Sequence, residues 1–295
     1  MQPLVIEVRR GGTVESRHRV HAAAVRDGQL VAGAGDPRFV TFMRSAAKPL
    51  QALPLVRAVD DLAVEEIAIA CASHLARPDQ LAAVASLLRR AGARTEEDLE
   101  CGLAGEPPER IRHNCSGKHA GMLMLCRARG WPARGYRLAG HPVQEAMLEQ
   151  VAAAAEVDAS VIPTAVDGCG VVTFALPLER MARAFARLAA LEGGAPATAA
   201  MRARPELIRG EGSADTDLMR ALPGWVAKGG AEGVLCAAGP DGLGVALKCE
   251  DGNGRALAPA LAAFLAELGH PIEELVVREI RNSRGENVGC MSAKL

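Results

Sequence analysis

Lysine is scarce in this sequence. Only five of the 34 basic residues are lysine, namely Lys48, Lys118, Lys228, Lys248 and Lys294. Wherever a positive charge suffices, the chain uses arginine. Arginine cannot lose its proton near neutral pH and lysine can, so a lysine retained against this bias indicates a position that needs an amine. Lys294, in the C-terminal tail, is the one that chance explains best.

Three other features are missing, and each excludes a class of function. The formal net charge is −1, so the composition offers no electrostatic case for binding nucleic acid or an anionic membrane surface. No apolar stretch approaches the ~20 residues that span a bilayer. The N-terminal "MQPLVIEVRRGGTVESR" lacks the basic start and apolar region of a secretory signal. We therefore expect a soluble, cytoplasmic protein.

The eight cysteines include no CxxC pair, which argues against a zinc ribbon or a thioredoxin-type site. In a reducing compartment these cysteines should be thiols, either buried as small hydrophobic residues or used in metal or redox chemistry. We expect most of them in the core.

The apolar pattern changes twice along the 295 residues. Residues 3–33 alternate loosely and are broken by "RRGG" and "RDGQ", which predicts antiparallel strands with tight turns. Short apolar runs separated by glycines follow Gly224 and predict a β-meander, then a helix over 255–268 and a final strand or tail. Between them, helical spacing predicts helices over 77–92, 117–130, 142–156, 177–194 and 215–224. "LEGGAPATAAM" resembles a flexible link.

Strands at both ends and helices in the middle favour an α+β fold. The economical arrangement is one antiparallel sheet shared by the N- and C-terminal strands, with the helices as a second lobe. We predict a single catalytic domain over 1–295, with a sheet lobe at about 1–40 and 224–295 and a helical lobe at about 41–223.

Ser45 and Lys48 stand three residues apart in "RSAAKPLQ", so one helical turn brings them to the same face. A serine hydroxyl is a poor nucleophile until a base takes its proton. A lysine held neutral by burial and by neighbouring positive charge can be that base. The amides of a helix N-terminus can also support an oxyanion. Ser-x-x-Lys also occurs by chance in chains of this length.

A second lysine motif, Lys228-Gly229-Gly230, lies on an expected strand. Glycine lets a substrate backbone approach closely because it has no Cβ. Penicillin-recognising serine enzymes combine Ser-x-x-Lys with a later Lys-[Thr/Ser]-Gly, and both motifs occur here in that order. Gly229 lacks the central hydroxyl, which leaves the hydrogen bond made there without a donor.

Cys115, Lys118 and Cys169 are candidate metal ligands. Two cysteines with a nitrogen donor suit zinc, although a lysine ligand must first lose its proton. Buried free cysteines beside glycine turns are the alternative interpretation.

Three polar residues near these motifs also have ordinary explanations. Ser73, in "CASH", can cap a turn. Asp167, followed by Gly168, can be a turn residue, and His119 can be a hydrogen-bonded core histidine.

Taken together, the motifs resemble the L-asparaginases of the inducible rhizobial type. The resemblance spans roughly residues 3 to 270. It rests on "RSAAKPLQ", "CASH", "CGLAGEPP", "HNCSGKHAGML", "GYRLAGHPVQ", "DGCGVVTFALPLERMARAFARLA" and "KGGAEGVLCAA". That family is unrelated to the bacterial asparaginases with threonine nucleophiles.

The resemblance implies a serine β-lactamase-like fold, a homodimer, and hydrolysis of L-asparagine to L-aspartate and ammonia. It also implies two Ser–Lys pairs in one cleft, Ser45 with Lys48 and Ser73 with Lys228. The metal site of the family, usually zinc, falls on Cys115, Lys118 and Cys169. Positions around the substrate match Arg44, His119 and Asp167. In the mechanism that we expect, Lys48 activates Ser45, and a charged Lys228 lowers the pKa of Lys48 and relays protons through Ser73.

Two other interpretations stay open. One is a different amidohydrolase on the same fold, acting on glutamine, a β-lactam or a peptide-like amide. The other is a non-catalytic, zinc-dependent sensor, which would have no need of two Ser–Lys pairs.

Overall fold

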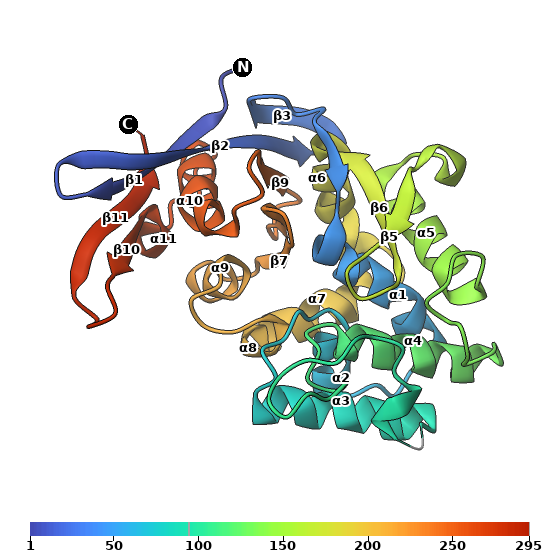
Figure 1. The fold of residues 1–295 in the computed structure, drawn as a ribbon. Coiled ribbons are helices and arrows are strands. Elements are labelled where there is room, and N and C mark those ends of the chain that lie inside the picture. The colour runs from blue at the N-terminus through green and yellow to red at the C-terminus, as the bar shows by residue number, and fades with distance from the viewer. Residues whose placement is uncertain (94, 295) are drawn as a thin grey trace. The chain divides into compact units, whose positions relative to one another are not determined.

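The computed structural model describes residues 1–93 and 95–294, and the chain forms two compact units (Figure 1). The first unit comprises 1–41, 176–186 and 212–295, and the second comprises 42–175 and 187–211. The first therefore also takes in 176–186 and 212–223, which the sequence analysis assigned to the helical lobe. That the whole chain is one catalytic domain stays a prediction.

An eight-stranded sheet organises the first unit. The strand order is β10-β11-β1-β2-β9-β8-β7, and β3 also pairs with β2. Ile6 pairs with Ala293, so the two ends of the chain lie side by side in one antiparallel sheet, as predicted. The strands are β1 (Leu4–Arg10), β2 (Thr13–Arg26), β3 (Gln29–Ala34), β7 (Val226–Gly230), β8 (Val234–Ala238), β9 (Gly244–Cys249), β10 (Val277–Arg281) and β11 (Asn287–Ala293).

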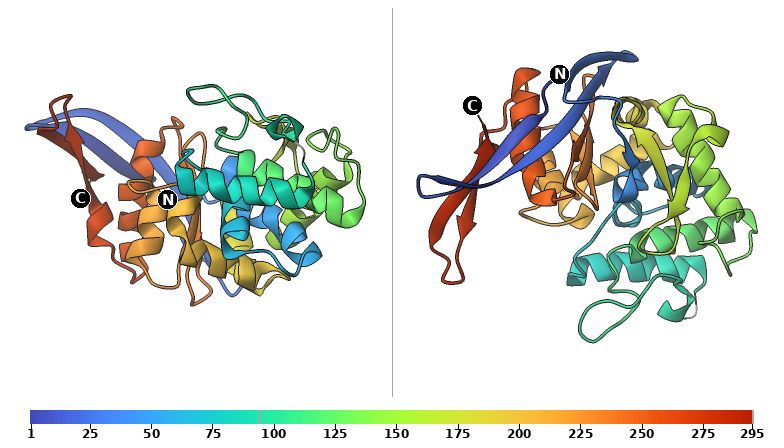
Figure 2. Two further views of the ribbon diagram at one scale, coloured as in Figure 1. Left: turned by 90° about the horizontal axis from the view of Figure 1, so that it is seen from below. Right: turned by 45° about the horizontal axis from the view of Figure 1, so that its top comes forward.

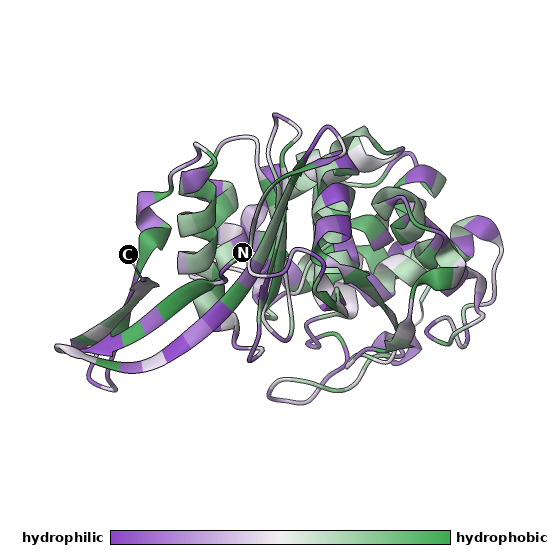
Figure 3. Cartoon of the chain, turned by 90° about the horizontal axis from the view of Figure 1, so that it is seen from above, coloured by the Kyte–Doolittle hydropathy of each residue, from purple (hydrophilic) through white to green (hydrophobic). Residues whose placement is uncertain are grey.

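Strand β2 changes character along its length because its surroundings change. Its first half alternates between exposed and less exposed residues, as a strand with one solvated face should. Figure 3 shows the alternation of hydrophilic and hydrophobic residues along the strands beside the N-terminus. From Val20 to Val25 every residue is buried, and β3 and β9 pair with this half on its two edges. β2 is therefore the central strand of the unit.

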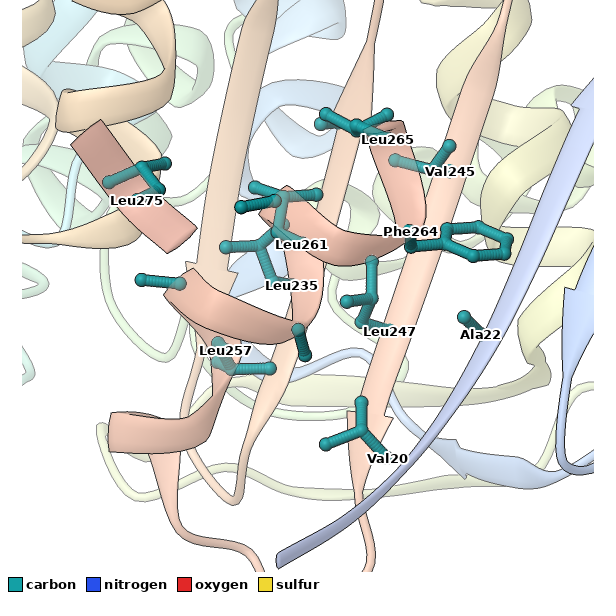
Figure 4. Packing of buried hydrophobic residues seen from close by; sticks show 14 of the residues in the cluster. Val20, Ala22, Leu235, Val245, Leu247, Leu257, Leu261, Phe264, Leu265 and Leu275 are labelled. Carbon is teal, nitrogen blue, oxygen red and sulfur yellow. The ribbon is translucent and has the colours of Figure 1, made fainter. Parts of the chain in front are cut away.

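Helix α10 (Leu257–Glu267) packs on the sheet, and most of its residues are buried in the core of this unit. Leu261 and Phe264 pack toward Leu247 of β9 and Ala22 of β2 (Figure 4). All four of these residues are fully buried. Burying a leucine or phenylalanine side chain contributes about 1.5 to 3 kcal/mol, so this layer holds the sheet and helix together.

Gly244 allows a second helix to approach the sheet. A Cβ at this position would lie 2.1 Å from the carbonyl oxygen of Ala182 and 2.4 Å from the amide nitrogen of Ala186. Only glycine permits that distance between strand β9 and helix α6 (Leu178–Arg187). The remaining helices of the unit are α9 (Ala214–Ala221), η5 (Gly254–Ala256) and α11 (Glu273–Val276).

The second unit is mainly helical (Figure 2). A small sheet of order β4-β6-β5 accompanies the helices, with β4 (Val40–Phe42), β5 (Thr164–Val166) and β6 (Val172–Pro177). The helices are η1 (Arg44–Ala47), α1 (Lys48–Ala58), α2 (Val64–Ala70), α3 (Pro78–Ala91), η2 (Glu96–Asp98), α4 (Ser116–Arg129), α5 (Pro142–Ala155), η3 (Ala159–Val161), η4 (Leu188–Ala190), α7 (Gly194–Ala203) and α8 (Pro205–Ile208).

Most predicted elements are confirmed, and one is wrong. The helices expected over 77–92, 117–130 and 142–156 are α3, α4 and α5. The expected flexible link "LEGGAPATAAM" is instead largely helix α7. Gly193, with φ +81°, precedes this helix, and its alanines favour helix once Ala197 and Ala200 are buried. Glycine therefore marks the start of an element here. Among the described residues, no helix combines the length and apolarity needed to cross a bilayer.

Candidate active site

Ser45 and Lys48 stand one helical turn apart, as their spacing predicts. The turn is η1, and the Lys48 amide donates to the Ser45 carbonyl oxygen where α1 begins. Ser45 is half-buried, whereas Lys48 is fully buried. Among the described residues, no hydrogen bond joins their two side chains.

Three oxygens of the second unit surround the Lys48 amine. Nζ lies 2.5 Å from the Ala72 carbonyl oxygen, 3.0 Å from Ser73 Oγ and 3.5 Å from the Asn114 carbonyl oxygen. Burial lowers the pKa of Lys48; Cys115 opposes this shift and the charge of Lys118 adds to it. Carbonyls only accept hydrogen bonds, so Ser73 is the partner that can donate to a neutral amine.

The candidate metal ligands converge where α4 begins. Cys115 is the N-cap of α4, Lys118 follows within its first turn, and Cys169 comes from the turn before β6. Lys118 Nζ donates to Cys169 Sγ over 3.2 Å, and the Cys169 thiol is hydrogen-bonded to Cys115. All three residues are buried. The structure therefore brings together residues that lie up to 54 positions apart in the chain.

The charges at this site suit a cation. The hydrogen bond from Cys169 is the main cause that lowers the pKa of Cys115 well below its ordinary value, and the charge of Lys118 adds to it. Burial opposes a charge on Lys118, but Cys169, Cys115 and Asp167 together raise the pKa of its amine. Two sulfurs and one amine form a donor set that zinc accepts. Binding would release the protons that these groups now hold, and zinc itself stays a prediction.

Arg44 and Asp167, both expected around the substrate, are paired with each other. Arg44 Nε donates to Asp167 Oδ1 over 2.7 Å, and the amide of Gly168 donates to the same oxygen. Arg44 also has φ +51°, a left-handed conformation that is rare outside glycine. Such a backbone costs of order 1 to 3 kcal/mol and persists only where its surroundings hold it. The strained residue directly precedes Ser45.

His119 is enclosed in the core of the second unit. The amide of Glu100 donates to Tyr136 Oη over 2.8 Å, which leaves the Tyr136 hydroxyl proton for His119 Nδ1, 2.7 Å away. Burial, with Lys118, holds the pKa of His119 well below its ordinary value, so the ring is neutral. His119 Nε2 has no hydrogen-bond partner among the described residues. A role of His119 toward the substrate stays a prediction.

Lys228 lies on β7, in the first unit, and is fully buried. Its Nζ donates to the Gly229 carbonyl oxygen over 2.6 Å and lies 3.5 Å from Asp215 Oδ2, which also accepts from the Gly229 amide. Asp215, on α9, is a counter-ion that no sequence motif indicated. Its neighbours include Thr216 and a second acid, Asp217, so nothing in the local sequence distinguishes it. The pairing of Lys228 with Ser73, a residue of the second unit, stays a prediction.

The sequence analysis also missed a histidine–serine contact. His74 follows Ser73 directly, and its Nε2 lies 2.7 Å from Oγ of Ser116, the first residue of α4. The two residues are 42 positions apart and both are buried. No local spacing relates them, so only the fold could reveal this contact.

The first unit holds another group of potential metal ligands, His18, Cys249 and Asp251. His18 Nδ1 lies 2.6 Å from Asp251 Oδ2, and Cys249 Sγ donates to Asp251 Oδ1 over 3.0 Å. Arg255 Nε donates to His18 Nε2 over 2.9 Å. The ring proton must therefore be on Nδ1, and both ring nitrogens have protein partners. This group is closed by its own hydrogen bonds.

Two of the solved structures that resemble this chain are similar enough to bear on its fold. Two structures of a protein named Mglu, one of them in its glutamate form, are each 14% identical to it, with TM-scores of 0.51 and 0.50. They match 87% and 90% of this chain, and this chain covers 62% and 72% of theirs. A β-lactamase candidate from Bacteroides dorei DSM 17855 is 10% identical with a TM-score of 0.47, over 84% of this chain and 93% of its own. The chain thus spans about two thirds of the length of the Mglu chains.

None of the curated proteins matches the sequence. The family model of L-asparaginase II, however, matches residues 6–293. The α+β architecture agrees with it, and the fold is serine β-lactamase-like, as the motifs implied. Because the match covers nearly the whole chain, both units included, this protein belongs to the L-asparaginase II family.

Proposed function

We propose that this protein hydrolyses L-asparagine to L-aspartate and ammonia through an ester formed on Ser45. The observation that carries the proposal is the Lys48 amine. It is fully buried, its pKa is lowered by burial, and it stands one helical turn from the half-buried Ser45. A neutral amine is the base that a serine nucleophile needs. Membership of the L-asparaginase II family supports amidohydrolase activity in general.

In the acylation step, Lys48 Nζ takes the proton of Ser45 as Ser45 Oγ attacks the carboxamide carbon. The resulting oxyanion is stabilised by backbone amides, that of Ser45 among them. When the intermediate collapses, the C–N bond breaks and the leaving nitrogen receives the proton from Lys48. Ammonia departs, and the aspartyl group stays on Ser45 as an ester.

In the deacylation step, water attacks the ester carbon and Lys48 again takes a proton. Ser73 acts as the relay, because its hydroxyl lies 3.0 Å from Lys48 Nζ and is fully buried. A completely buried hydroxyl suits proton transfer better than attack on a substrate, which favours Ser45 as the nucleophile. The ester bond breaks, the proton returns to Ser45, and aspartate is released.

Arg44 and Asp167 would bind the two ends of the amino acid. Asparagine carries an α-ammonium group and an α-carboxylate, and these match the carboxylate of Asp167 and the guanidinium of Arg44. The present ion pair between them, at 2.7 Å, would open around the zwitterion. A substrate with a blocked α-amine could not make this exchange. We therefore expect acylated substrates to be rejected.

Zinc, held by Cys115, Lys118 and Cys169, would act as a Lewis acid or as an ordering group beside the site. Lys228 is proposed as the second lysine of the reaction, with Asp215 as its counter-ion at 3.5 Å. A homodimer is carried over from the family resemblance.

The deciding experiment measures ammonia release from L-asparagine by the wild-type protein and by Ser45→Ala, with L-glutamine as a parallel substrate. We expect wild-type turnover and a loss of about 10³-fold or more in the variant. Ser283→Ala is the matched control, because this exposed serine lies in the turn between β10 and β11. Near-normal activity of Ser45→Ala would transfer the nucleophile to Ser73. Absence of ammonia release from asparagine by the wild-type protein, with zinc supplied, would overturn the proposal.

Glutamine is the alternative substrate. Mglu, whose fold resembles that of this chain, is known in a glutamate form. Glutamine has the same two charged ends and one more methylene, a difference worth about 1 to 3 kcal/mol in a hydrophobic pocket. Comparing kcat/KM for the two amides separates these activities. A zinc-dependent sensor would instead bind an amino acid in calorimetry and release no ammonia.

A further inference from the structure

His74 joins two segments of the second unit that both contact Lys48. Its side chain is 1% exposed and reaches from the segment after α2 to the beginning of α4. Its backbone amide donates to the Asn114 carbonyl oxygen over 3.2 Å. Its ring lies between the amide of Ala76 and the hydroxyl of Ser116. The His74 amide and Nε2 therefore join the two segments, and Nδ1 holds the turn within its own segment.

The hydrogen bonds fix which ring nitrogen carries the proton. The amide of Ala76 donates to His74 Nδ1 over 3.1 Å, so Nδ1 is the acceptor and the proton is on Nε2. Nε2 then donates to Ser116 Oγ over 2.7 Å, and the Ser116 hydroxyl donates to the Ile111 carbonyl oxygen, also over 2.7 Å. The neutral ring is satisfied at both nitrogens.

The backbone after His74 depends on the same ring. Ala76 has φ +57°, a left-handed conformation that is unusual for alanine. Its amide points at His74 Nδ1, so the imidazole holds the tight turn that ends the Ser73 segment. The turn and the ring thus support each other.

Lys48 takes one acceptor from each segment that this contact joins. The Ala72 carbonyl lies just before Ser73, and the Asn114 carbonyl lies two residues before Ser116. The two carbonyls hold Nζ from two segments of the chain, and the Ser73 hydroxyl lies 3.0 Å from the same nitrogen. The relative placement of the two segments therefore decides where the base of the reaction points.

We propose that His74 and Ser116 form a positioning pair, which holds the Ala72 and Asn114 carbonyls in place so that the Lys48 amine is aimed at the reacting serines. Neither residue exchanges a proton with the substrate, and both act through Lys48. The inference rests on the proposed function, since it assigns their role in the same serine chemistry. It also goes beyond it, because the pair was not part of the expected catalytic set.

Two substitutions of His74 separate its two hydrogen bonds. The shorter His74→Asn keeps an acceptor for the Ala76 amide and loses contact with Ser116. His74→Gln keeps a donor that reaches Ser116 and loses the acceptor for Ala76. Ser116→Ala removes the other half of the pair. We expect His74→Asn and Ser116→Ala each to lower kcat about 10- to 100-fold with KM nearly unchanged, as expected for a base misplaced by about 1 Å. His74→Gln should retain more of kcat than His74→Asn.

The double variant His74→Asn/Ser116→Ala tests whether the two residues act as one unit. If they do, the double variant is no slower than either single variant. His141→Asn is the matched control. Its Nδ1 accepts from the Val143 amide over 3.2 Å and its Nε2 lies 2.9 Å from the Pro132 carbonyl oxygen, at the start of α5. This variant should keep wild-type kcat. Thermal unfolding of each variant confirms that it is folded at the assay temperature.

A substrate-independent probe separates failure of the pair from failure of the asparaginase proposal. Phenylmethanesulfonyl fluoride reports an activated serine as a mass increase, and its rate should fall in His74→Asn in parallel with kcat. If the wild-type protein is sulfonylated but releases no ammonia, the amide assignment fails, and the pair stands if the variants react more slowly. The positioning pair is overturned if the folded His74→Asn and Ser116→Ala variants match the wild-type protein in kcat and in the rate of sulfonylation. It is also overturned if the decreases in kcat of the two single variants multiply in the double variant. A wild-type protein that is neither sulfonylated nor active overturns both proposals.

Discussion

Burial makes Lys48 useful as an amine and costly as a cation. The side chain is fully buried, and the oxygens around its amine are two carbonyls and one hydroxyl, none of them charged. Removing a charge from water disfavours the charged form, and the opposing effect of Cys115 and Cys169 offsets only part of that cost. Lysine is retained at this position although the chain otherwise favours arginine, because a guanidinium could not lose its proton there.

In Lys48→Arg the side chain stays basic but cannot give up its proton, so we expect the activity to be lost. We expect turnover to fall about 10²- to 10⁴-fold, which is the contribution of a general base. We also expect a lower midpoint of thermal unfolding, because a permanently charged group is then buried beside neutral acceptors. Lys294→Arg is the control, since Lys294 is exposed. A Lys48→Arg variant with near wild-type ammonia release would mean that Lys48 is not the base.

His74 predicts a dependence of stability on pH. Burial is the main cause that lowers the pKa of His74 from 6.5 to about 4. Between these values the unfolded chain binds more protons than the folded one, so the free energy of unfolding falls as the pH falls. The loss begins near pH 6.5, is complete below about pH 4, and amounts to at most about 3 kcal/mol.

Urea unfolding at a series of pH values between 7 and 4 measures this effect. The wild-type protein should lose stability more steeply across the interval than His74→Asn, which has no titratable side chain at position 74. The comparison of slopes matters because His74→Asn also loses a hydrogen bond and starts from a lower stability. Parallel slopes in the two proteins would show that His74 does not titrate as described.

At the residue scale, what could be predicted from sequence depended on the distance between partners. Ser45 and Lys48 are one turn apart, and local spacing is enough to relate them. The contact that Lys48 makes with Ser73, and those of Lys228 with Asp215 and His74 with Ser116, join residues far apart in the chain. Motif resemblance supplied Ser73 and Lys228. The resemblance did not indicate Asp215 or His74, because these residues contact residues of the motifs and are not themselves expected to react.

At the scale of elements, Gly117 sets the distance between α2 and α4. A Cβ at this position would lie 2.2 Å from the carbonyl oxygen of Ile69, far inside van der Waals contact. Gly117 lies between Cys115 and Lys118 in "HNCSGKHAGML". The close approach of the two helices therefore places the candidate metal ligands against the segment that follows α2, which carries Ser73.

Gly117→Ala should push these helices apart. We expect a loss of about 1 to 3 kcal/mol in the free energy of unfolding, the usual cost of overpacking. A fall in kcat should accompany it, because Asn114 would move away from Lys48. Gly12→Ala is the control, since no atom lies within 4 Å of the position that a Cβ would take on that glycine. A Gly117→Ala protein as stable and active as Gly12→Ala would contradict the close approach.

Elements with strong periodicity were predictable, and elements defined by long-range pairing were less so. Helices α3, α4 and α5 follow from apolar spacing alone. Helix α7 was missed because its glycines and proline look like breakers, although Gly193 only precedes it. Strand β11 was not predicted as an element of its own, because its residues form a strand only through pairing with β1 and β10. Local propensity carries little information about such a strand.

At the scale of the whole molecule, the cysteines divide into three groups. Cys115 and Cys169 lie together with Lys118 in the second unit. Cys249 belongs to the hydrogen-bonded group of His18 and Asp251 in the first unit. The third group belongs to neither cluster: Cys236 and most of its other members are buried, Cys290 is partly buried, and burial raises the pKa of Cys101 to about 12. The composition indicated that most cysteines are core residues, but it could not say which pair would meet.

This division predicts one zinc ion per chain, bound in the second unit. At Cys115 and Cys169 the metal would take the place of the shared proton and of one proton of the Lys118 ammonium, and these side chains would become its ligands. At His18 the metal would have to displace Arg255 from Nε2, or force the Nε2 proton against that guanidinium. The first exchange is therefore favoured over the second. Zinc content, measured by elemental analysis after dialysis against zinc and then against metal-free buffer, should be one per wild-type chain. It should fall to near zero in Cys115→Ser and Cys169→Ser and stay at one in Cys249→Ser.

The same variants test what the metal contributes. If zinc orders the substrate without taking part in each turnover, chelation and Cys169→Ser should raise KM more than they lower kcat, and Cys249→Ser should change neither. A total loss of turnover on chelation would make the metal essential to the reaction. Zinc retained by Cys115→Ser but lost from Cys249→Ser would move the metal to the first unit, and the lowered pKa of Cys115 would then serve the serine chemistry alone. Because the two ligand groups lie in different units, one series of cysteine variants decides which unit carries the metal and whether the reaction depends on it.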